Sequence, residues 1–392
     1  MTQKFTPLPE KSRTISIDVL RGFALLGILL VNMPTFHSPF LYLDSFTYWP
    51  SKMDKFFQGI VDLFAQANFY PLFAFLFGYG AMIIADRSQV KGIYFPAFFA
   101  RRLAILLIIG CIHAFLIWNG DILITYAITG FFFILFYRLS GQMLLRVGVV
   151  IYCIPVLFTT FLSMHSQEHF SENVDAVQTS IQNYSSGSVL EILKQRATDW
   201  AYMNLEMSAV TLGIGVLGLM LLGAAFAKLR WLVDVDNHKR LLIGLLITGL
   251  IFGLGARIAS SFYMDSLFLV IMQEQFSGAF IALFYMIVIV LSTQTTIGQK
   301  LLKPFANVGR LSMSNYLLQS IAMTFIFYSY GLGLYGSISY TAGFVLVFAF
   351  FIFQTLLSKW WMTRFQYGPI EYIWRWGTYG QKPTFKKQKM PY

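Results

Sequence analysis

The chain has 392 residues, of which 57% are hydrophobic and only 12% are charged. That much apolar surface excludes an ordinary soluble globular protein and indicates a polytopic membrane protein. The net charge is +11, but the basic residues gather at the ends of apolar runs and in one set of loops. They therefore indicate membrane topology rather than nucleic-acid binding.

Ten apolar stretches have roughly the length that crosses about 30 Å of hydrocarbon. They are predicted at residues 16–34, 58–84, 102–118, 121–137, 143–164, 204–227, 241–262, 275–292, 311–328 and 339–361. Only the short stretch WNGD separates the third from the fourth, so these two are expected to form a hairpin. We predict an all-α bundle of about ten transmembrane helices, with residues 1–392 forming a single integral membrane domain.

The distribution of basic residues predicts the orientation of this bundle. If the helices alternate and the N-terminus is cytoplasmic, cytoplasmic segments hold 23 of the 29 basic residues. The outer loops then hold only Lys52, Lys55, Lys194 and Arg196. Because Lys and Arg are enriched in cytoplasmic loops, both termini are predicted to be cytoplasmic.

Two segments outside the spans have a character of their own. Residues 165–200 are polar and are predicted to form a long, partly helical extracytoplasmic loop. Residues 362–392 include RFQYGPIEYIWRWGTYG, which mixes Trp, Tyr and Arg. That mixture is typical of a segment lying in the cytoplasmic interface of a membrane.

The first span opens with an acid and a base, Asp18 and Arg21, three residues apart and hence on one helix face. One interpretation is a self-neutralising pair that anchors the helix end. The other is a cytoplasmic binding site in which Arg21 faces an anionic ligand. Arg310 and Asn315, where the ninth span begins, are expected on the same side, with interhelical hydrogen bonds as the alternative role.

A second, richer group of polar residues is expected near the outer ends of the spans. It consists of Asn32, His37, Asp62, Gln66, Asn68, His113, Asn119, Asp121, Asn204, Glu206, Arg257, Asp265 and Glu274. Charges in hydrocarbon are costly, so such residues are usually paired or placed in a cavity. We predict that the group lines a hydrated pocket open to the outside, although each member alone could be structural.

Two histidines in this group are candidates for chemistry. A neutral imidazole can take a proton from a hydroxyl or an amine near pH 7. Asp121 follows His113 by eight residues and could orient it, so His37, His113 and Asp121 are the candidate catalytic residues. For each histidine the alternative is a hydrogen-bonding strut. His165 and His169 lack clear further ligands, and no metal site is predicted.

The two cysteines, Cys111 and Cys153, lie inside apolar runs. They are expected to be reduced packing residues.

Four segments resemble the YeiB-like family of bacterial inner-membrane proteins. They are SIDVLRGFALLGILLVNM, RRLAILLIIGCIHAFLIWNGDILITYAITG, NVGRLSMSNYLLQS and FQYGPIEYIWRWGTYG. That family is similar to the transmembrane acyltransferases, with which it shares an opening pattern present here as Ser16, Asp18, Arg21 and Gly22. The resemblance implies a multi-pass protein of the bacterial inner membrane.

The resemblance also implies an activity. An acyl group, most simply acetyl, would pass from cytoplasmic acyl-CoA to an extracytoplasmic hydroxyl or amine. The donor would bind near Asp18 and Arg21, and His37 or His113 with Asp121 would supply the base. Asn32, Asn119 or Arg257 would donate hydrogen bonds to the developing oxyanion.

Acyl-CoA enters this scheme as a substrate, and no metal is expected. The expected partners are the lipid bilayer and a small-molecule or envelope-glycan acceptor, with a second copy of the chain as a further candidate and no nucleic acid. Two alternatives remain open, a small-solute transporter using the same polar cavity and a non-catalytic scaffold. The sequence shows no inverted repeat, which weighs against transport.

Overall fold

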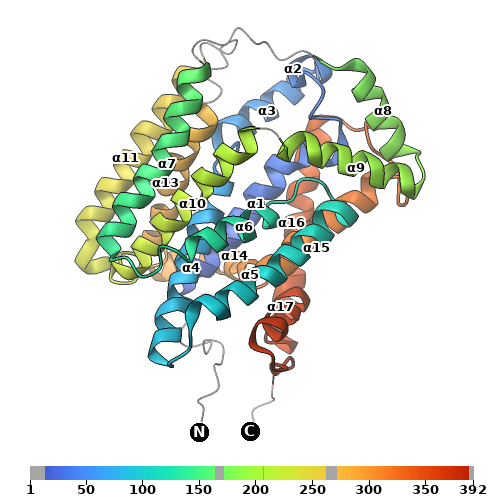
Figure 1. Cartoon of the computed structure of the whole chain (residues 1–392). Coiled ribbons are helices and arrows are strands. Elements are labelled where there is room, and N and C mark those ends of the chain that lie inside the picture. Colours follow the sequence, from blue (N-terminus) through green and yellow to red (C-terminus); the bar gives the residue numbers. More distant parts are fainter. Residues whose placement is uncertain (1–13, 164–171, 206, 262–271, 388–392) are drawn as a thin grey trace.

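The computed structural model describes residues 14–163, 172–205, 207–261 and 272–387, and they form a bundle of helices (Figure 1). The predicted all-α class is confirmed. Up to residue 163 the helices are α1 Ile15–His37, α2 Ser45–Tyr48, α3 Lys52–Phe64, α4 Phe69–Val90, α5 Phe95–Ile112, the π-helix η2 His113–Ile117, α6 Leu123–Phe133 and α7 Gly141–Ser163. Those that follow are α8 Val174–Ser185, α9 Val189–Asn204, α10 Met207–Lys228, α11 Val235–Ser261, the π-helix η3 Met272–Ser277, α13 Gly278–Ser292, α14 Thr296–Arg310, α15 Ser312–Phe327, α16 Tyr340–Arg364 and α17 Pro369–Tyr379.

Among the described residues, eight helical stretches are long and apolar enough to cross a membrane. They are Ile15–His37, Lys52–Val90, Phe95–Ile117, Gly141–Ser163, Ala209–Lys228, Val235–Ile258, Glu274–Ser292 and Tyr340–Arg364. The predicted fourth and ninth spans are the helices α6 and α15, with 11 and 16 residues. Both are shorter than the roughly 20 residues of a full span, so the count of ten stays a prediction.

The predicted second span, 58–84, is not one continuous helix. α3 ends at Phe64 and α4 begins at Phe69, and between them Ala67 adopts a φ of 58°. That left-handed conformation is costly for a residue with a Cβ, so the break needs support from its surroundings.

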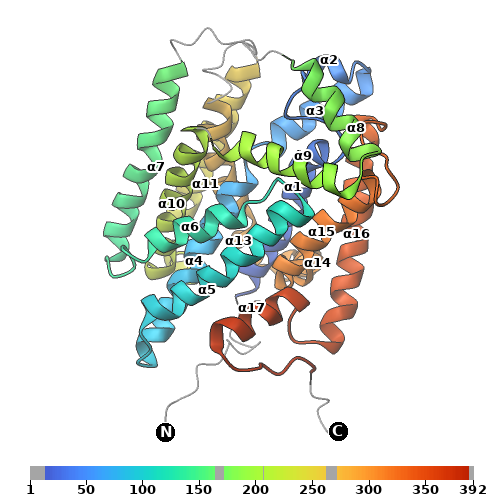
Figure 2. The same ribbon diagram turned by 45° about the vertical axis from the view of Figure 1, so that its right-hand side comes forward.

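The bundle has two different ends (Figures 1 and 2). The start of α1 and the helix α17 lie at one end, which we call the terminal end, together with the connections α4–α5, α10–α11 and α13–α14. The helices α2, α8 and α9 lie at the other, the capped end. The described part of the predicted loop 165–200 thus consists mainly of two helices that cover one end of the bundle.

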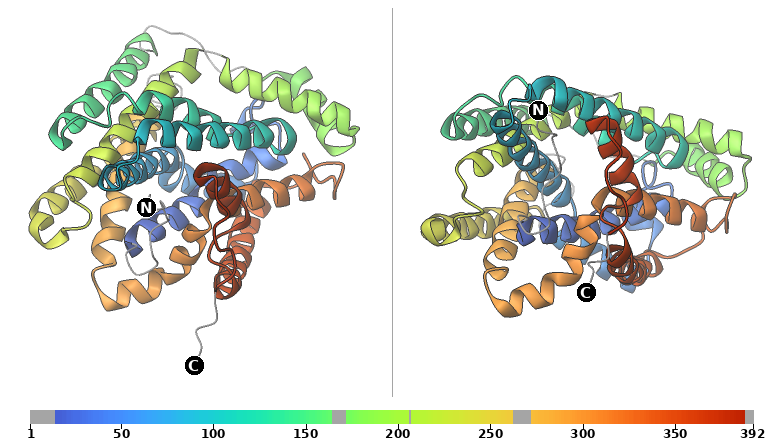
Figure 3. Two further views of the ribbon diagram at one scale, coloured as in Figure 1. Left: turned by 60° about the horizontal axis from the view of Figure 1, so that its bottom comes forward. Right: turned by 90° about the horizontal axis from the view of Figure 1, so that it is seen from below.

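Central and peripheral helices differ in how much of their apolar surface is buried. The spans of α1 and α10 are 61% buried, whereas those of α7 and α11 are only 22% buried. α11 lies at the rim of the bundle (Figure 3). Ile154 and Phe158 on α7 and Ile251 on α11 are exposed, which fits contact with lipid. Cys111 and Cys153 are exposed too, so the predicted packing role of the cysteines is wrong.

α1 and α14 approach each other closely at two glycines. A Cβ atom on Gly22 of α1 would collide with the backbone carbonyl of Phe305, and one on Gly309 of α14 would collide with that of Asp18. Small residues allow helix backbones to approach in this way inside a membrane. The contact holds the start of α1, and hence Asp18, against α14.

α17 ties α15 to α5 at the terminal end. One carboxylate oxygen of Glu371 accepts hydrogen bonds from the backbone N–H groups of Met313 (2.7 Å) and Ser314 (3.0 Å), and the other accepts from the Ser314 hydroxyl. These bonds satisfy N–H groups that lack partners within the helix. The indole of Trp374 donates to the backbone carbonyl of Arg102 (2.9 Å) and lies under its guanidinium.

The glycine contact predicts a position-dependent response to a single added methyl group. Gly22→Ala and Gly309→Ala should each lower the stability by about 1–3 kcal/mol, because a backbone must move to admit the Cβ. Gly244→Ala is the matched control, since nothing lies within 4 Å of its added Cβ. Thermal unfolding in detergent measures the effect. Equal midpoints for all three variants would contradict the close contact of α1 and α14.

The hydrogen bonds of the Glu371 carboxylate to the start of α15 predict that Glu371→Ala lowers the stability by about 1–3 kcal/mol, because the first N–H groups of α15 lose their acceptor. Lys359→Ala, at an exposed position of α16, should leave the unfolding temperature unchanged. A Glu371→Ala protein as stable as the wild type would show that α17 does not hold α15.

Candidate functional site

The connection between α5 and α6 is shaped to bring two distant positions of one hairpin together. α5 continues as the π-helix η2, and the backbone N–H of Trp118 closes it on the carbonyl of His113 (2.8 Å). π-helical turns are rare and are frequent at functional sites. At the following Gly120, any Cβ would collide with the indole of Trp118. The glycine therefore lets the chain fold back, so that Asp121 returns to His113.

His113 lies at the centre of a buried hydrogen-bonded chain. Its Nδ1 is 2.7 Å from Oδ1 of Asp121, and its Nε2 is 2.8 Å from Oγ of Ser320 on α15. The second oxygen of Asp121 accepts a hydrogen bond from the backbone N–H of Ile124 (2.8 Å). Because a carboxylate only accepts, we assign the imidazole proton to Nδ1, which leaves Nε2 to accept the Ser320 proton.

The surroundings of these three hydrogen-bonded side chains are buried and aromatic. His113, Ser320 and Asp121 are 0%, 1% and 8% exposed. The rings of Tyr316 and Trp118 lie 5.0 and 6.2 Å from the imidazole. A hydroxyl, an imidazole and a carboxylate in this order are the arrangement of nucleophile, base and orienting acid in acyl-transfer chemistry.

The sequence predicted part of this hydrogen-bonded arrangement of Asp121, His113 and Ser320. The eight-residue spacing suggested that Asp121 orients His113, and the structure brings the two side chains into contact. Ser320 was missed, since it is 207 residues from His113 and meets it only through helix packing. The one sequence feature that could have pointed to Ser320 is its place at the end of the segment NVGRLSMSNYLLQS, which carries part of the family resemblance.

The other candidate histidine, His37, has a different environment. It ends α1, is 1% exposed, and contacts the rings of Trp49 and Phe327 at 5.7 and 5.6 Å. Neither of its ring nitrogens has a hydrogen-bond partner among the described residues. Asp54 interacts with His37 only through its charge, and no acid among the described residues forms a hydrogen bond with it. The cavity beside His37 is only about 10 Å³, which leaves no room for a substrate.

Arg257 supports the break between α3 and α4. Its Nη2 donates to the carbonyl of Gln66 (2.7 Å) and to Oδ1 of Asn68 (2.9 Å), and its Nη1 donates to the carbonyl of Asp62. Its Nε donates to the Ser277 hydroxyl (3.2 Å). This network satisfies the backbone carbonyls that the broken helix leaves without partners, a structural use of the guanidinium.

At the terminal end, the predicted polar residues form separate interactions. Arg21 pairs with Asp18 at 3.4 Å within α1. Asn315 donates from its side chain to the carbonyl of Val308 (3.0 Å) and to the Ser358 hydroxyl (2.9 Å). Asn315 thus takes the interhelical role that was its alternative, and Arg310 follows nearby as the last residue of α14.

Comparison with known proteins identifies the family. A family model described as "Protein of unknown function (DUF418)" matches residues 226–381. The chain is 36% identical to the uncharacterized protein YxaH of Bacillus subtilis, over 98% of this chain and 99% of that protein. It is 30% identical to the uncharacterized protein YeiB of Escherichia coli, over 93% of this chain and 95% of that protein. The chain belongs to the YeiB-like family. In this YeiB-like chain, Ser320 and Glu371 lie inside the matched DUF418 segment, whereas His113 and Asp121 precede it.

Part of the predicted outer group forms two separate hydrogen-bonded clusters in the YeiB-like chain. Arg257 with the α3–α4 break is one, and the hairpin with His113 is the other. Asn119 belongs to the hairpin, where its amide nitrogen lies 3.8 Å from the sulfur of Met203. Asn32 is half-buried on α1, and Glu206 and Asp265 lie outside the described residues. In the described part of the chain, no group of three His, Cys, Asp or Glu side chains is placed to hold a metal ion.

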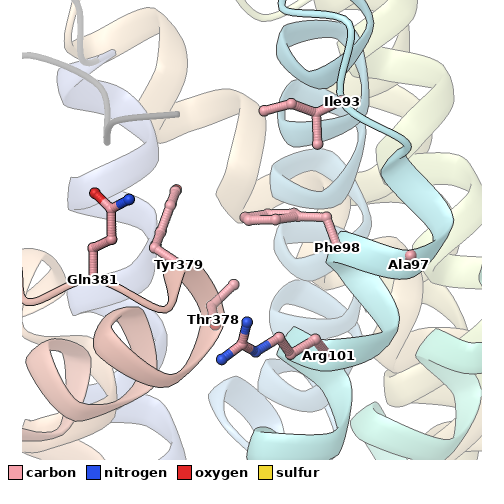
Figure 4. A pocket seen from close by; sticks show the side chains of 7 residues that line it. All are labelled: Ile93, Ala97, Phe98, Arg101, Thr378, Tyr379 and Gln381. Atoms are coloured by element: carbon pink, nitrogen blue, oxygen red, sulfur yellow. The ribbon is translucent and has the colours of Figure 1, made fainter. Parts of the chain in front are cut away.

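A pocket that the sequence did not predict opens at the terminal end (Figure 4). It has a volume of about 420 Å³, within the range of small-molecule sites. It lies between α5 and α17 and is lined by Ile93, Ala97, Phe98, Arg101, Thr378, Tyr379 and Gln381. A guanidinium, an amide and two aromatic rings in one pocket are suited to a ligand with both charged and flat apolar parts.

The hydrogen bonds of Arg257 predict that replacing this arginine destabilises the protein much more than replacing the exposed Arg230. Arg257→Gln should lower the stability by on the order of 3 kcal/mol, because buried carbonyls lose their donors. Arg230→Gln breaks only an exposed pair with Asp234 and should leave the stability nearly unchanged. Thermal unfolding of both variants in one detergent tests this. A small effect at Arg257 would mean that the helix break does not depend on it.

Proposed function

We propose that this YeiB-like protein is a membrane-embedded acyltransferase whose reacting centre is Ser320, His113 and Asp121. The observation that supports this proposal is their buried hydrogen-bonded chain. Nε2 of His113, 2.8 Å from Oγ of Ser320, is placed to accept the serine proton. Asp121, 2.7 Å from Nδ1, would stabilise the imidazolium that forms.

The transfer takes two half-reactions. In the first, Oγ of Ser320 attacks the carbonyl carbon of an acyl thioester and gives its proton to Nε2 of His113. The carbon–sulfur bond then breaks, and the leaving thiolate takes that proton. In the second, a hydroxyl or amine acceptor attacks the carbonyl carbon of the acyl-serine and gives its proton to Nε2 of His113. The bond between that carbon and Oγ of Ser320 then breaks, and Oγ takes the proton from His113. Asn119, in the turn beside Asp121, is the candidate donor for the oxyanion.

The thioester donor in this proposal is cytoplasmic acyl-CoA. The terminal-end pocket, with Arg101 in its wall, suits the charged head of such a donor. From Arg101 to His113 the chain rises about 18 Å in helical geometry. That span is of the order of an extended pantetheine arm, so α5 would run beside it from the pocket to the reacting centre. In this proposal the terminal end faces the cytoplasm, which the charge asymmetry supports. The family resemblance supports a location in a bacterial inner membrane.

Because the three side chains are buried, reaction requires an opening. α9 packs across η2 at the capped end (Figure 2). A movement of α9 away from η2 would admit an acceptor from that side. This route keeps donor and acceptor on opposite sides of the reacting centre, as a transfer across the membrane needs.

Transport of a small solute is the second candidate, and the break between α3 and α4 favours it. Helices interrupted within the membrane recur at the binding sites of transporters. In this chain the break is held by Arg257 of the protein itself, through the four hydrogen bonds described above. The acyl-transfer proposal is therefore better supported by the described contacts.

The proposal predicts a covalent intermediate. Purified protein incubated with radiolabelled acetyl-CoA should acquire label, and peptide mapping should place it on Ser320. His113→Gln and Asp121→Asn should slow labelling by about 10²–10⁴-fold, because the proton acceptor is lost or misoriented. Ser320→Ala should abolish it. His238→Gln, a histidine in the α10–α11 region, is the matched control and should label like the wild type.

Label on another residue, or labelling that survives in Ser320→Ala, would refute the assigned reacting centre. Absence of both label and thioester hydrolysis, together with solute uptake into vesicles that depends on Arg257, would favour transport instead.

A further inference from the structure

A buried arginine at the capped end has donors that the protein does not use. Arg196 on α9 is 1% exposed, and its Nη1 donates to the carbonyl of Phe115 in η2 (3.3 Å). Among the described residues, nothing accepts a hydrogen bond from its Nε or Nη2. A buried, charged donor without an acceptor is costly, so a retained one calls for an explanation.

Further unused donors surround the same turn of η2. Trp200 lies one helical turn after Arg196 on α9, and its ring packs on that of Phe115 at 5.0 Å. Trp118 closes η2 and stacks on Phe36 at 4.1 Å. In the described part of the chain, the buried Nε1 atoms of both tryptophans lack acceptors. The unsatisfied groups of Arg196, Trp118 and Trp200 are therefore all donors, whereas the unsatisfied hydroxyl of Tyr328, whose ring lies 5.8 Å from the Arg196 guanidinium, can also accept.

The nearest acid on α9 is already engaged. The carboxylate of Asp199 accepts hydrogen bonds from Tyr42 (2.7 Å), Tyr184 (2.6 Å) and Gln195 (2.7 Å). Burial raises the pKa of Asp199, whereas these three bonds and the nearby charge of Arg196 lower it. Burial also raises the pKa of Tyr42, so its phenol stays a donor. Asp199 thus stabilises the capped end and attracts the charge of Arg196, but among the described residues it accepts no hydrogen bond from Nε or Nη2 of that arginine.

We propose that Arg196, Trp118 and Trp200 bind an oxyanion, a carboxylate or a phosphate, on a ligand that enters at the capped end. The open edge of a guanidinium, with Nε and one Nη, matches two oxygens of such a group. The indole N–H groups are single donors that a third or bridging oxygen can satisfy. An uncharged ligand would leave the charge of Arg196 with only the Tyr328 ring, 5.8 Å away, and the already hydrogen-bonded carboxylate of Asp199 as partners.

The site adjoins the reacting centre. The ring of Trp118 lies 6.2 Å from that of His113, and both residues belong to the same short turn. If the ligand is the acyl acceptor, the acceptor is an acidic molecule, such as a uronic acid or a phosphate-bearing sugar or glycerol. That identification rests on the proposed acyl transfer, whereas the binding itself does not.

Binding of defined anions tests the proposal. Wild-type protein in detergent is titrated with glucuronate and with glycerol 1-phosphate, and its affinity is measured by calorimetry. We expect Arg196→Met to weaken binding at least tenfold and Arg196→Lys to weaken it less, since a charge without the planar fork remains. Lys194→Met, on the exposed face of the same helix, is the matched control and should bind like the wild type.

A second arm distinguishes a free acid from a lipid headgroup. Protein in nanodiscs with or without phosphatidylglycerol is released and examined by native mass spectrometry. Retention of that lipid by the wild type but not by Arg196→Met, without affinity for the soluble acids, would assign the oxyanion to a lipid. If the wild type binds no probe in either arm, or Arg196→Met binds as tightly as the wild type, the site is refuted.

Two measurements separate this inference from folding and from the proposed reaction. Without ligand, Arg196→Met should unfold at the wild-type temperature or above it, because it removes unsatisfied buried donors. Trp200→Phe keeps the ring but loses the N–H, so it should fold normally and bind more weakly. His113→Gln, which blocks the proposed transfer, should bind the anions like the wild type. An Arg196→Met or Trp200→Phe protein that unfolds at a much lower temperature would assign these groups to the fold instead.

Discussion

The structure depends on the need of every polar group in hydrocarbon to find a partner inside the protein. Water cannot supply one there, and an unsatisfied group costs several kcal/mol. Arg257 meets this need by binding the carbonyls of the α3–α4 break, and Asn315 meets it by joining α14 to α16. Glu371 does the same for the first N–H groups of α15 at the terminal end. The polar residues of the spans therefore determine how the helices are joined as well as what chemistry they can do.

This requirement explains which features could be predicted from the sequence. The helices could be predicted from the apolar runs, because these follow from local composition. The distribution of Lys and Arg predicts which end faces the cytoplasm, and that orientation stays a prediction. The contact of His113 with Asp121 is almost as local, since a tight turn closes it. Ser320 and the α3–α4 break could not be read in the same way. One depends on α15 packing beside η2, and the other on an arginine 189 residues away from Asn68.

The same distinction between local and distant contacts separates the two candidate catalytic histidines. His37 and His113 have similar sequence surroundings, each following an apolar helix before a polar turn. Only His113 receives an acid on one nitrogen and a hydroxyl on the other. The difference arises because the hairpin returns to His113, whereas the chain after His37 leads into a layer of aromatic rings. Spacing along the chain thus distinguishes such histidines only when the partner is close in sequence.

Two attachments hold α5 with its continuation η2 against α15, and this pairing shapes the site. At the terminal end, Glu371 and Trp374 of α17 bind α15 and α5. Towards the capped end, His113 and Ser320 join the same two elements. The two attachments differ in kind, because the first satisfies backbone groups and is purely structural. The second joins two groups that can exchange a proton.

Buried donors that lack an acceptor are informative in the same way. Around η2, Arg196, Trp118 and Trp200 keep buried donors without acceptors among the described residues, although Asp199 beside them is fully engaged. A fold that satisfies Arg257 through four hydrogen bonds has the means to satisfy a second buried arginine. That it leaves Arg196 open, next to the turn that holds His113, is the pattern expected where the missing acceptor comes from a ligand. The hydrogen bonds that the protein completes thus outline its architecture, and the donors left open on Arg196, Trp118 and Trp200 are the basis of the proposed anion site.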